Sequence, residues 1–416
     1  MSKKIKIFTI SDHPLSPSGV GTQTKYMIEA MLRTGKYEFV SFGGAIGHQN
    51  HEPQHTEEWG HDWVIWPVDG YGTADQVRAL LAQAKPDILW FMTDPRFYSW
   101  LWQIENEIRT VVPMVYYHVW DNYPYPKFNR PYYLSNDHIA CISKLTYDIA
   151  QTVAPEVESS YIPHAVDEQI FKIHEPEVVA KYREEKGLED TFLCFWNSRN
   201  ARRKQSGTLI WWFKEFLDKV GHDKAKLIMH TDTKDVHGQD LEAIIHELDL
   251  KDGEVMFSRN KVLPEDLAMM YNMADVTINI SDAEGFGLSA LESLSCGTPV
   301  VATLTGGLQD QVKNGDKHYG VGIEPVSKAI IGSQDVPYIY EDRLSKDDFI
   351  AAMTEMYEMT QEDRQTLSKE CAEWAQTEFS FDKFVTSWDD LFTRIYEEQG
   401  SWDTRTGYTP YEMRTF

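Results

Sequence analysis

Short apolar runs rich in β-branched and aromatic residues recur along the whole chain, separated by segments of helical length. The runs of the first half read KIKIFTIS, DILWFMT, PMVYYHV, HIACIS and SYIPHAV. Those of the second half read FLCFWNS, AKLIMHT, EVMFS, DVTINIS, PVVAT and GVGIEP. Near-continuous apolar strands of this kind are typical of parallel sheets that helices cover on both faces. The alternation in both halves therefore predicts an α/β protein with two doubly wound domains.

A change of composition places the boundary between these domains. The chain has 416 residues, more than one domain usually contains. Between Asp167 and Asp190 the sequence EQIFKIHEPEVVAKYREEKGLED is polar and charged, and it follows the last apolar run of the first half. We expect an N-terminal domain over residues 1–170 and a C-terminal domain over residues 188–379.

The chain closes with an amphipathic segment and an aromatic tail. After Asp382 the sequence FVTSWDDLFTRIYEEQ predicts a helix with one apolar side. That side contains Phe384, Trp388, Leu391, Phe392 and Ile395. We expect this helix to pack against the body of the protein, and the aromatic residues of the tail GSWDTRTGYTPYEMRTF to dock as well.

The net charge of the chain restricts which partners it can bind. The formal net charge is −25, so most of the surface repels phosphate polymers and anionic membranes. An anionic ligand then needs a local basic cluster, and NSRNARRKQSG offers Arg199, Arg202, Arg203 and Lys204 within six positions.

No apolar run approaches the roughly 18 residues of a membrane helix, and the apolar part of MSKKIKIFTIS is too short for a signal peptide. Four scattered cysteines in apolar settings are typical of a reducing compartment, so we expect a cytoplasmic protein.

The stretch SDAEGFGLSALESLSCGTPVVAT, residues 281–303, combines features of a ligand site. DVTINIS predicts a buried strand, DAEGFG a turn and LSALESLS a short helix that feeds the next strand, VVAT. Gly297 suits the left-handed position after that helix, and the proline that follows prevents its continuation. Open parallel sheets bind ligands at the carboxyl ends of their strands, so this turn is a candidate site.

Two interpretations of the turn compete. In the first, the free N–H groups of Gly287, Leu288 and Ser289 face an anion with help from the helix dipole. Glu292 would accept hydrogen bonds from ribose hydroxyls, and Glu284 from sugar hydroxyls. In the second, the turn is only an N-terminal capping arrangement flanked by solvated acids.

The same residues resemble the signature of family 4 retaining glycosyltransferases. EGFGLSALESLSCGTPVVAT has two glutamates separated by seven residues and then small-Gly-Thr-Pro-Val-Val. NSRNARRK resembles the arginine and lysine pair that holds the donor diphosphate, which implies that role for Arg199 and Lys204. LPEDLAMMYNMADVTINIS, SPSGVGTQTKYMIEAML and YYHVWD resemble further stretches of the family. YIPHAVDEQIF does so with His164 and Ala165 where the family has Asn and Gly.

The resemblance implies the GT-B fold, two Rossmann-like domains facing across a cleft. The last helix returns to the first domain in this fold, so residues 380–416 would complete the N-terminal domain. It also implies a retaining hexosyl- or pentosyltransferase with a nucleotide-diphosphate sugar as co-substrate, which needs neither cofactor nor metal. The implied catalytic residues are His118, Glu284, Arg199 and Lys204, with His118 near the transferred sugar and the acceptor.

The residues expected to bind the donor come from three loops. Glycines after the first strand let the backbone approach a phosphate or sugar, and a glycine turn there is also routine in α/β folds. The set comprises Gly19, Gly21, Arg203, Gly285, Phe286, Gly287, Leu288, Ser289 and Glu292.

The acceptor is expected at HVWDNYPYPKFNRPYY, with Trp120, Asp121 and Tyr123 as candidate residues. Aromatic faces stack on sugar rings, although such residues also anchor loops. A glycan or a small hydroxylated molecule fits the acidic chain best. Hydroxymethylated DNA, contacted through Lys127 and Arg130, is the alternative that the charge disfavours.

Two functions of other classes remain open, a sugar-nucleotide epimerase of the same fold and a catalytically silent nucleotide-binding protein. A metal site is not expected. The histidines of GHQNHEPQHTEEWGH match no ordinary zinc spacing; they are His48, His51, His55 and His61.

Overall fold

The computed structural model describes residues 3–411, which form two compact units. The first unit contains the described residues up to Trp120, then Pro124–His164 and the chain from Asp382 onward. The second unit contains Asp121–Tyr123 and Ala165–Phe381. The short segment Asp121–Tyr123, which sequence analysis places in the N-terminal domain, thus clusters with the second unit. The last part of the tail, residues 412–416, lies outside the described residues.

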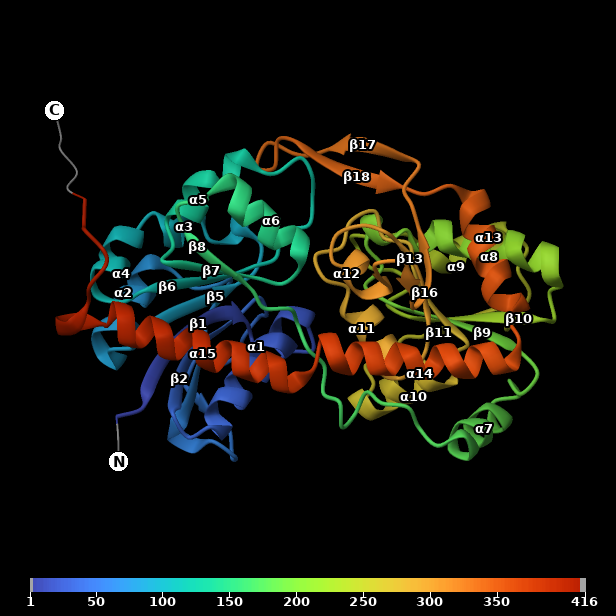
Figure 1. The fold of residues 1–416 in the computed structure, drawn as a ribbon, viewed down its shortest axis with the longest axis horizontal. Coiled ribbons are helices and arrows are strands. Elements are labelled where there is room, and N and C mark those ends of the chain that lie inside the picture. Colours follow the sequence, from blue (N-terminus) through green and yellow to red (C-terminus); the bar gives the residue numbers. More distant parts are fainter. Residues whose placement is uncertain (1–2, 412–416) are drawn as a thin grey trace. The chain divides into compact units, whose positions relative to one another are not determined.

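An eight-stranded sheet forms the centre of the first unit, in the order β3-β4-β2-β1-β5-β6-β7-β8. Figure 1 labels β1, β2 and β5 to β8 of this sheet. All neighbouring strands are parallel except β3 and β4. Its strands are β1 (Ile5–Asp12), β2 (Tyr37–Gly44), β3 (Gln54–His55), β4 (Trp63–Pro67), β5 (Ile88–Met92), β6 (Met114–His118), β7 (His138–Cys141) and β8 (Glu158–Tyr161). The helices of this unit are α1 (Gly19–Arg33), α2 (Ala74–Ala84), α3 (Ser99–Trp102), α4 (Glu105–Val111), α5 (Arg130–Leu134), α6 (Lys144–Val153) and α15 (Phe381–Gln399).

Helix α15 packs on this sheet through the apolar side that its sequence predicts. All five predicted residues are buried. The ring of Trp388 lies 4.9 Å from that of Tyr117 on β6 and 5.9 Å from that of Trp90 on β5, between ring centroids. Burial of such large aromatic surfaces stabilises the unit. The last helix therefore packs on the sheet of the first unit.

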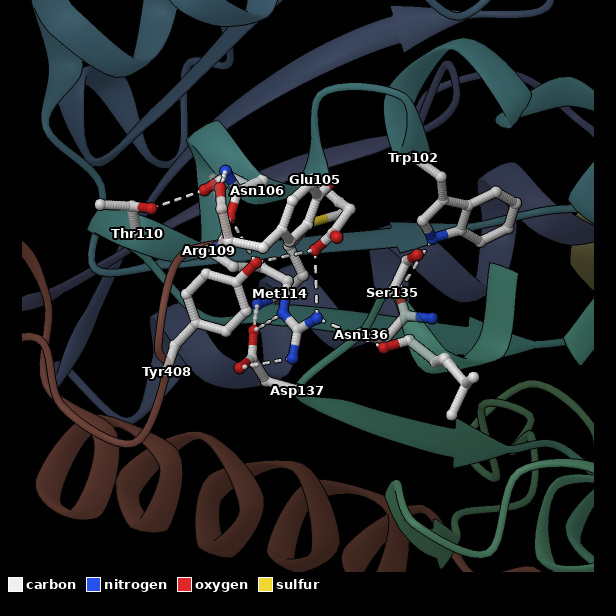
Figure 2. A network of polar contacts seen from close by, with 12 residues as sticks. Trp102, Glu105, Asn106, Arg109, Thr110, Met114, Ser135, Asn136, Asp137 and Tyr408 are labelled. Atoms are coloured by element: carbon white, nitrogen blue, oxygen red, sulfur yellow. Dashed lines mark hydrogen bonds and ion pairs between the residues drawn. The ribbon is translucent and has the colours of Figure 1, made fainter. Parts of the chain in front are cut away.

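The tail after α15 docks on α4 and on the start of β7. Arg405 donates a hydrogen bond of 2.8 Å to Asp137, and both side chains are almost fully buried. Asp137 also pairs with Arg109, whose guanidinium lies 4.4 Å from the centre of the Tyr408 ring. Figure 2 shows Arg109 between Glu105 and Asp137, with Tyr408 beside it. The described part of the tail therefore docks on the first unit.

The second unit is built on a six-stranded parallel sheet in the order β11-β10-β9-β12-β13-β16. Its strands are β9 (Phe192–Asn197), β10 (Ala225–His230), β11 (Val255–Ser258), β12 (Val276–Asn279), β13 (Val300–Thr303) and β16 (Gly320–Ile323). Two antiparallel pairs lie outside it, β14 (Lys313–Asn314) with β15 (Lys317–His318) and β17 (Ser327–Ile331) with β18 (Ile339–Arg343).

Helices and apolar strand residues together form the core of the second unit. The helices are α7 (Pro176–Glu185), α8 (Ser206–Val220), α9 (Leu241–Glu247), α10 (Pro264–Met273), α11 (Leu288–Ser295), α12 (Leu308–Val312), α13 (Lys346–Glu358) and α14 (Gln361–Glu378). Residues of β9, β10, β12 and β13 pack with those of α8 and α13 in one apolar cluster. The strands are buried along most of their length, as their continuous apolar runs predict.

Candidate active site

The order of the strands locates the site in the second unit. From β9 the chain moves outward to β10 and β11, and then returns to β12 on the other side of β9. Ligands of doubly wound sheets bind where the order reverses in this way, outside the carboxyl ends of the strands. The loop after β9 contains the basic cluster and the loop after β12 contains Glu284, so the fold brings the two predicted segments together at this point.

Lys204 and Glu284 form an ion pair there. The Lys204 ammonium contacts Oε2 of Glu284, and each side chain is only 12% exposed. Arg203 donates to the carbonyl of Ala283 at 2.6 Å, and its guanidinium lies 3.6 Å from the same Glu284 oxygen. Two cations thus contact one carboxylate.

Burial and charge together set the ionisation of this group. Burial alone would raise the pKa of Glu284, but the charges of Lys204 and Arg203 outweigh it and hold that pKa below its usual value. Burial and the neighbouring Arg203 lower the pKa of Lys204, while Glu284 opposes that change. Asp121 also acts on Lys204 and Arg203 with its negative charge.

The start of α11 presents unused backbone donors. Gly287 precedes the helix at φ +91°, a left-handed conformation that suits glycine, and no side chain caps the helix. Among the described residues, the N–H groups of Gly287, Leu288 and Ser289 find no acceptor. Such groups at a helix start are ready to bind an anion. The alternative of a capping arrangement with solvated acids does not fit, because Glu284 is buried and paired.

Two glycines that sequence analysis does not single out support the turn from behind. Gly306 lies so close to Glu284 that a Cβ atom there would be 1.8 Å from the Glu284 carbonyl oxygen. The N–H of Gly307 donates to that oxygen at 3.0 Å. In the sequence, the pair Gly306-Gly307 shortly after VVAT could have indicated this close approach of the backbone. Gly297 ends α11 at φ +75°, which confirms its predicted left-handed position.

Glu292 lies one turn inside α11. Its Oε2 accepts a hydrogen bond of 2.7 Å from the Tyr271 hydroxyl and a longer one of 3.5 Å from Asn197. Burial raises the pKa of Glu292 to about 7, although these two donors oppose the shift. Both donors reach the same oxygen, and the ribose role of Glu292 stays a prediction.

The two outer arginines of the basic cluster have other partners. Arg199, 61% exposed, forms a two-point ion pair with Asp235 at 2.6 and 3.1 Å. Arg202 donates to both carboxylate oxygens of Glu341 on β18. The structure therefore brings Lys204 and Arg203 to Glu284, whereas Arg199 and Arg202 pair elsewhere.

The expected acceptor residues differ in their surroundings. Tyr123 and Tyr340 form an isolated antiparallel bridge, and the Lys328 ammonium lies 5.1 Å from the centre of the Tyr123 ring. Trp120 is 4% exposed and packs edge-on against Phe128. Its ring therefore contributes to the packing of its loop.

The remaining expected residues belong to the first unit. His118 ends β6, as predicted, and is fully buried, with Nε2 2.8 Å from the Tyr133 hydroxyl. Burial lowers the pKa of His118 to about 3, so the ring is neutral. Gly19 begins α1, and a Cβ on Gly21 would lie 2.7 Å from the His13 carbonyl oxygen. In residues 3–411 no group of three or more His, Cys, Asp or Glu could hold a metal ion.

Comparison with known proteins shows which family most of the second unit resembles. Residues 180–369 match the family described as glycosyl transferases group 1. These residues are similar to the group 1 glycosyl transferases. The match spans both loops of the site, and the predicted family resemblance is confirmed.

Curated relatives of the group 1 domain align over limited segments. The alpha-monoglucosyldiacylglycerol synthase of Streptococcus pneumoniae is 30% identical over 173 residues, 40% of this chain and 37% of the synthase. A D-inositol 3-phosphate glycosyltransferase of Paenarthrobacter aurescens is 45% identical over 62 residues, 15% of either chain. The chain thus spans well under half the length of these relatives.

Solved structures extend the likeness to the whole fold. A sucrose-phosphate synthase from Thermosynechococcus elongatus has 17% identity and a TM-score of 0.73, covering 95% of this chain and 100% of its own. Anabaena HepE in complex with UDP and glucose has 16% identity and a TM-score of 0.69, covering 94% and 100%. These likenesses confirm the predicted GT-B fold class. Among the described residues, no helix of the chain has the length and apolar character needed to cross a bilayer.

Proposed function

We propose that this protein transfers a sugar from a nucleotide-diphosphate sugar to a hydroxyl acceptor, with retention of the anomeric configuration and without a metal ion. The observation that carries the proposal is the buried Lys204–Glu284 pair, with Arg203 beside it and the uncapped start of α11 nearby in sequence. These groups offer cations and backbone N–H donors for a diphosphate and a carboxylate for sugar hydroxyls.

The reaction places new charge on the leaving group. When the bond between the anomeric carbon and the diphosphate oxygen breaks, its electron pair stays on that oxygen. Fixed cations and N–H groups that face this oxygen lower the barrier, because they need no rearrangement as the charge develops. Lys204 and the N–H groups of residues 287–289 would serve here, and Arg199 would join them by leaving its ion pair with Asp235.

Retention follows if the acceptor attacks from the face that the diphosphate leaves. The acceptor oxygen then bonds to the anomeric carbon, and its proton passes to the departing phosphate oxygen. Glu284 would orient the sugar in this scheme and need not act as a nucleophile. His118 and the segment from Trp120 to Tyr123 are proposed on the side of the sugar and the acceptor, a glycan or a small hydroxylated molecule.

Solved structures of similar fold suggest the first donor to test. HepE has been crystallised with UDP-glucose, and a trehalose-6-phosphate protein from E. coli with UDP-2-fluoro glucose. UDP-glucose is therefore our first candidate.

A cytoplasmic location is proposed as well, because the four cysteines Cys141, Cys194, Cys296 and Cys371 are all free thiols. Cell fractionation tests it, and recovery in a secreted fraction would contradict it.

The decisive experiment follows release of free UDP from UDP-glucose, with other nucleotide sugars in parallel, with and without a panel of sugar and polyol acceptors. We expect slow hydrolysis alone, faster release with one acceptor class, and a product of retained configuration by NMR. Exhaustive chelation should leave the rate unchanged. Strict dependence on added divalent metal, an inverted product, or isomerisation of the donor without an acceptor would contradict the proposal.

A further inference from the structure

Strand β18, together with its partner β17, lies outside the main sheet of the second unit (Figure 1). Its residue Tyr340 pairs with the short segment Asp121–Tyr123. The Tyr340 N–H donates to the Tyr123 carbonyl, and the Asn122 side chain donates to the Tyr340 carbonyl at 3.0 Å. Two hydrogen bonds thus attach the expected acceptor segment to β18.

The next residue of β18, Glu341, attaches the basic loop. Both terminal nitrogens of Arg202 donate to its two carboxylate oxygens, at 2.8 and 2.6 Å. The Glu341 side chain is only 4% exposed, and the paired charges hold its pKa below the usual value against the effect of burial. Two-point pairs of this kind fix direction as well as distance. Arg202 begins the 3₁₀ turn Arg202–Lys204, so the pair fixes the turn that presents Lys204.

The last two residues of β18 attach the glutamate turn. The Asp342 N–H donates to the Asp282 carbonyl at 2.9 Å, and Arg343 pairs with the Asp282 carboxylate at 2.9 Å. Gln205 donates to the same carboxylate at 2.7 Å. Asp282 lies two positions before Glu284. Four consecutive residues of one strand therefore contact three segments that are far apart in sequence.

We propose that β18 is a positioning strand, which fixes the acceptor segment Asp121–Tyr123 relative to Lys204 and Glu284, and that Glu341 and Arg343 are positioning residues. The inference rests on the proposed glycosyl transfer. Transfer needs the acceptor hydroxyl at bonding distance from the sugar, and a displacement of about 1 Å can cost on the order of a hundredfold in rate. Hydrolysis uses mobile water and depends less on that alignment. Loosening β18 should therefore reduce transfer more than hydrolysis.

The test compares Glu341→Gln and Arg343→Gln with Asp335→Asn, an exposed acid in the loop between β17 and β18. The donor is UDP-glucose. The acceptor is the compound that most accelerates UDP release by the unsubstituted protein. Calorimetry measures UDP binding. We expect the ratio of transfer to hydrolysis to fall at least about tenfold in both variants, with the UDP Kd changed less than about threefold. Arg343→Lys should retain most of the ratio, and Asp335→Asn all of it.

A double variant separates positioning from direct contact with the donor. If Arg202 acts through Glu341, Arg202→Gln/Glu341→Gln should be no worse than either single change. A ratio that stays constant in Glu341→Gln, or a loss confined to UDP affinity in Arg202→Gln, would overturn the positioning role.

Hydrogen exchange gives a readout that needs no activity. Peptides covering residues 121–123 and 202–205 should both exchange faster in Glu341→Gln than in Asp335→Asn. Faster exchange of residues 339–343 alone would overturn the inference. An unsubstituted protein that neither binds UDP nor releases it from UDP-glucose would instead contradict the proposed function, and the two failures are thereby distinguished.

Discussion

At the scale of single residues, the charge on Lys204 is central to the proposed chemistry. Lys204→Ala removes the cation that we propose at the leaving group, and it leaves Glu284 with a weaker counter-charge. We expect turnover to fall by at least about a hundredfold, the usual loss for one such group. Unfolding should also become easier by up to about 3 kcal/mol, since a buried carboxylate loses its partner. Steady-state kinetics and thermal unfolding measure the two effects, with the exposed Lys181→Ala as control.

The role of Arg199 can be tested by comparing two variants, one of Arg199 and one of its ion-pair partner Asp235. Arg199 is 61% exposed and stays solvated when it leaves, and Asp235, 12% exposed, keeps a hydrogen bond from the His237 N–H, so Arg199 can leave Asp235 at a modest cost when a diphosphate binds. We expect Arg199→Ala to lose at least about a hundredfold in turnover. The matched variant Asp235→Asn should keep turnover within about threefold, because it frees the arginine. Near-wild-type turnover of Arg199→Ala would assign the diphosphate to Lys204 and Arg203 instead.

Glu292 should make nucleotide binding depend on pH. Its pKa of about 7 means that the carboxyl is mostly protonated at pH 6 and mostly ionised at pH 8. An ionised carboxylate accepts stronger hydrogen bonds from ribose hydroxyls, so UDP affinity should rise with pH over this window, by up to about tenfold. The phosphate of UDP also titrates in this range. The Glu292→Gln variant shows how much of the pH dependence of affinity comes from UDP itself. Parallel pH profiles of the two proteins in calorimetric titrations would rule out the ribose role.

At the scale of elements, the tail beyond α15 is predicted to stabilise the first unit. Arg405 is 3% exposed and neutralises Asp137 together with Arg109. Arg405→Ala should lower the free energy of unfolding by about 3 kcal/mol, because breaking a buried pair leaves an under-compensated charge. The exposed Asp403→Ala on the same turn serves as control. Chemical denaturation monitored by tryptophan fluorescence measures both, and equal stabilities would show that the tail is not part of the folded core.

Much of this architecture could be predicted from local pattern. The helix α15, the strand–turn–helix around Glu284 and the end of α11 at Gly297 follow from apolar period, glycine and proline. Strands β2 and β4 were missed, since YEFVSFGG ends in glycines and WVIWP is short and ends in proline. The β17–β18 pair was missed because its residues are largely polar or exposed and show no clear alternation.

The site could be predicted only in part. Its two loops were identified from their residues, but their contact was not, since Lys204 and Glu284 are 80 positions apart. The pairing of Arg199 with Asp235 and of Arg202 with Glu341 likewise depends on tertiary structure. Nothing local distinguishes Arg203, which meets Glu284, from Arg202, which points to β18. The roles of these residues in catalysis stay predictions.

At the scale of the whole molecule, the net charge favours a neutral acceptor over DNA. The chain has 40 basic and 65 acidic residues, a balance of −25. Apart from Lys204 and Arg203 at Glu284, the arginines of the basic cluster are neutralised by carboxylates, so little positive surface remains there for a DNA backbone. A duplex needs several phosphate contacts, whereas a neutral glycan needs none.

We therefore expect hydroxymethylated duplex DNA to receive no sugar from UDP-glucose at about 0.15 M salt, where surface charges are screened beyond about 8 Å. Transfer to a neutral acceptor should change less than about twofold between low and physiological salt, because no counterions are released from that acceptor. The two acceptors are compared in one assay with radiolabelled donor across a salt series. Label on the DNA, with a rate that falls steeply as salt rises, would reverse the assignment and show that a local basic surface prevails over the overall charge.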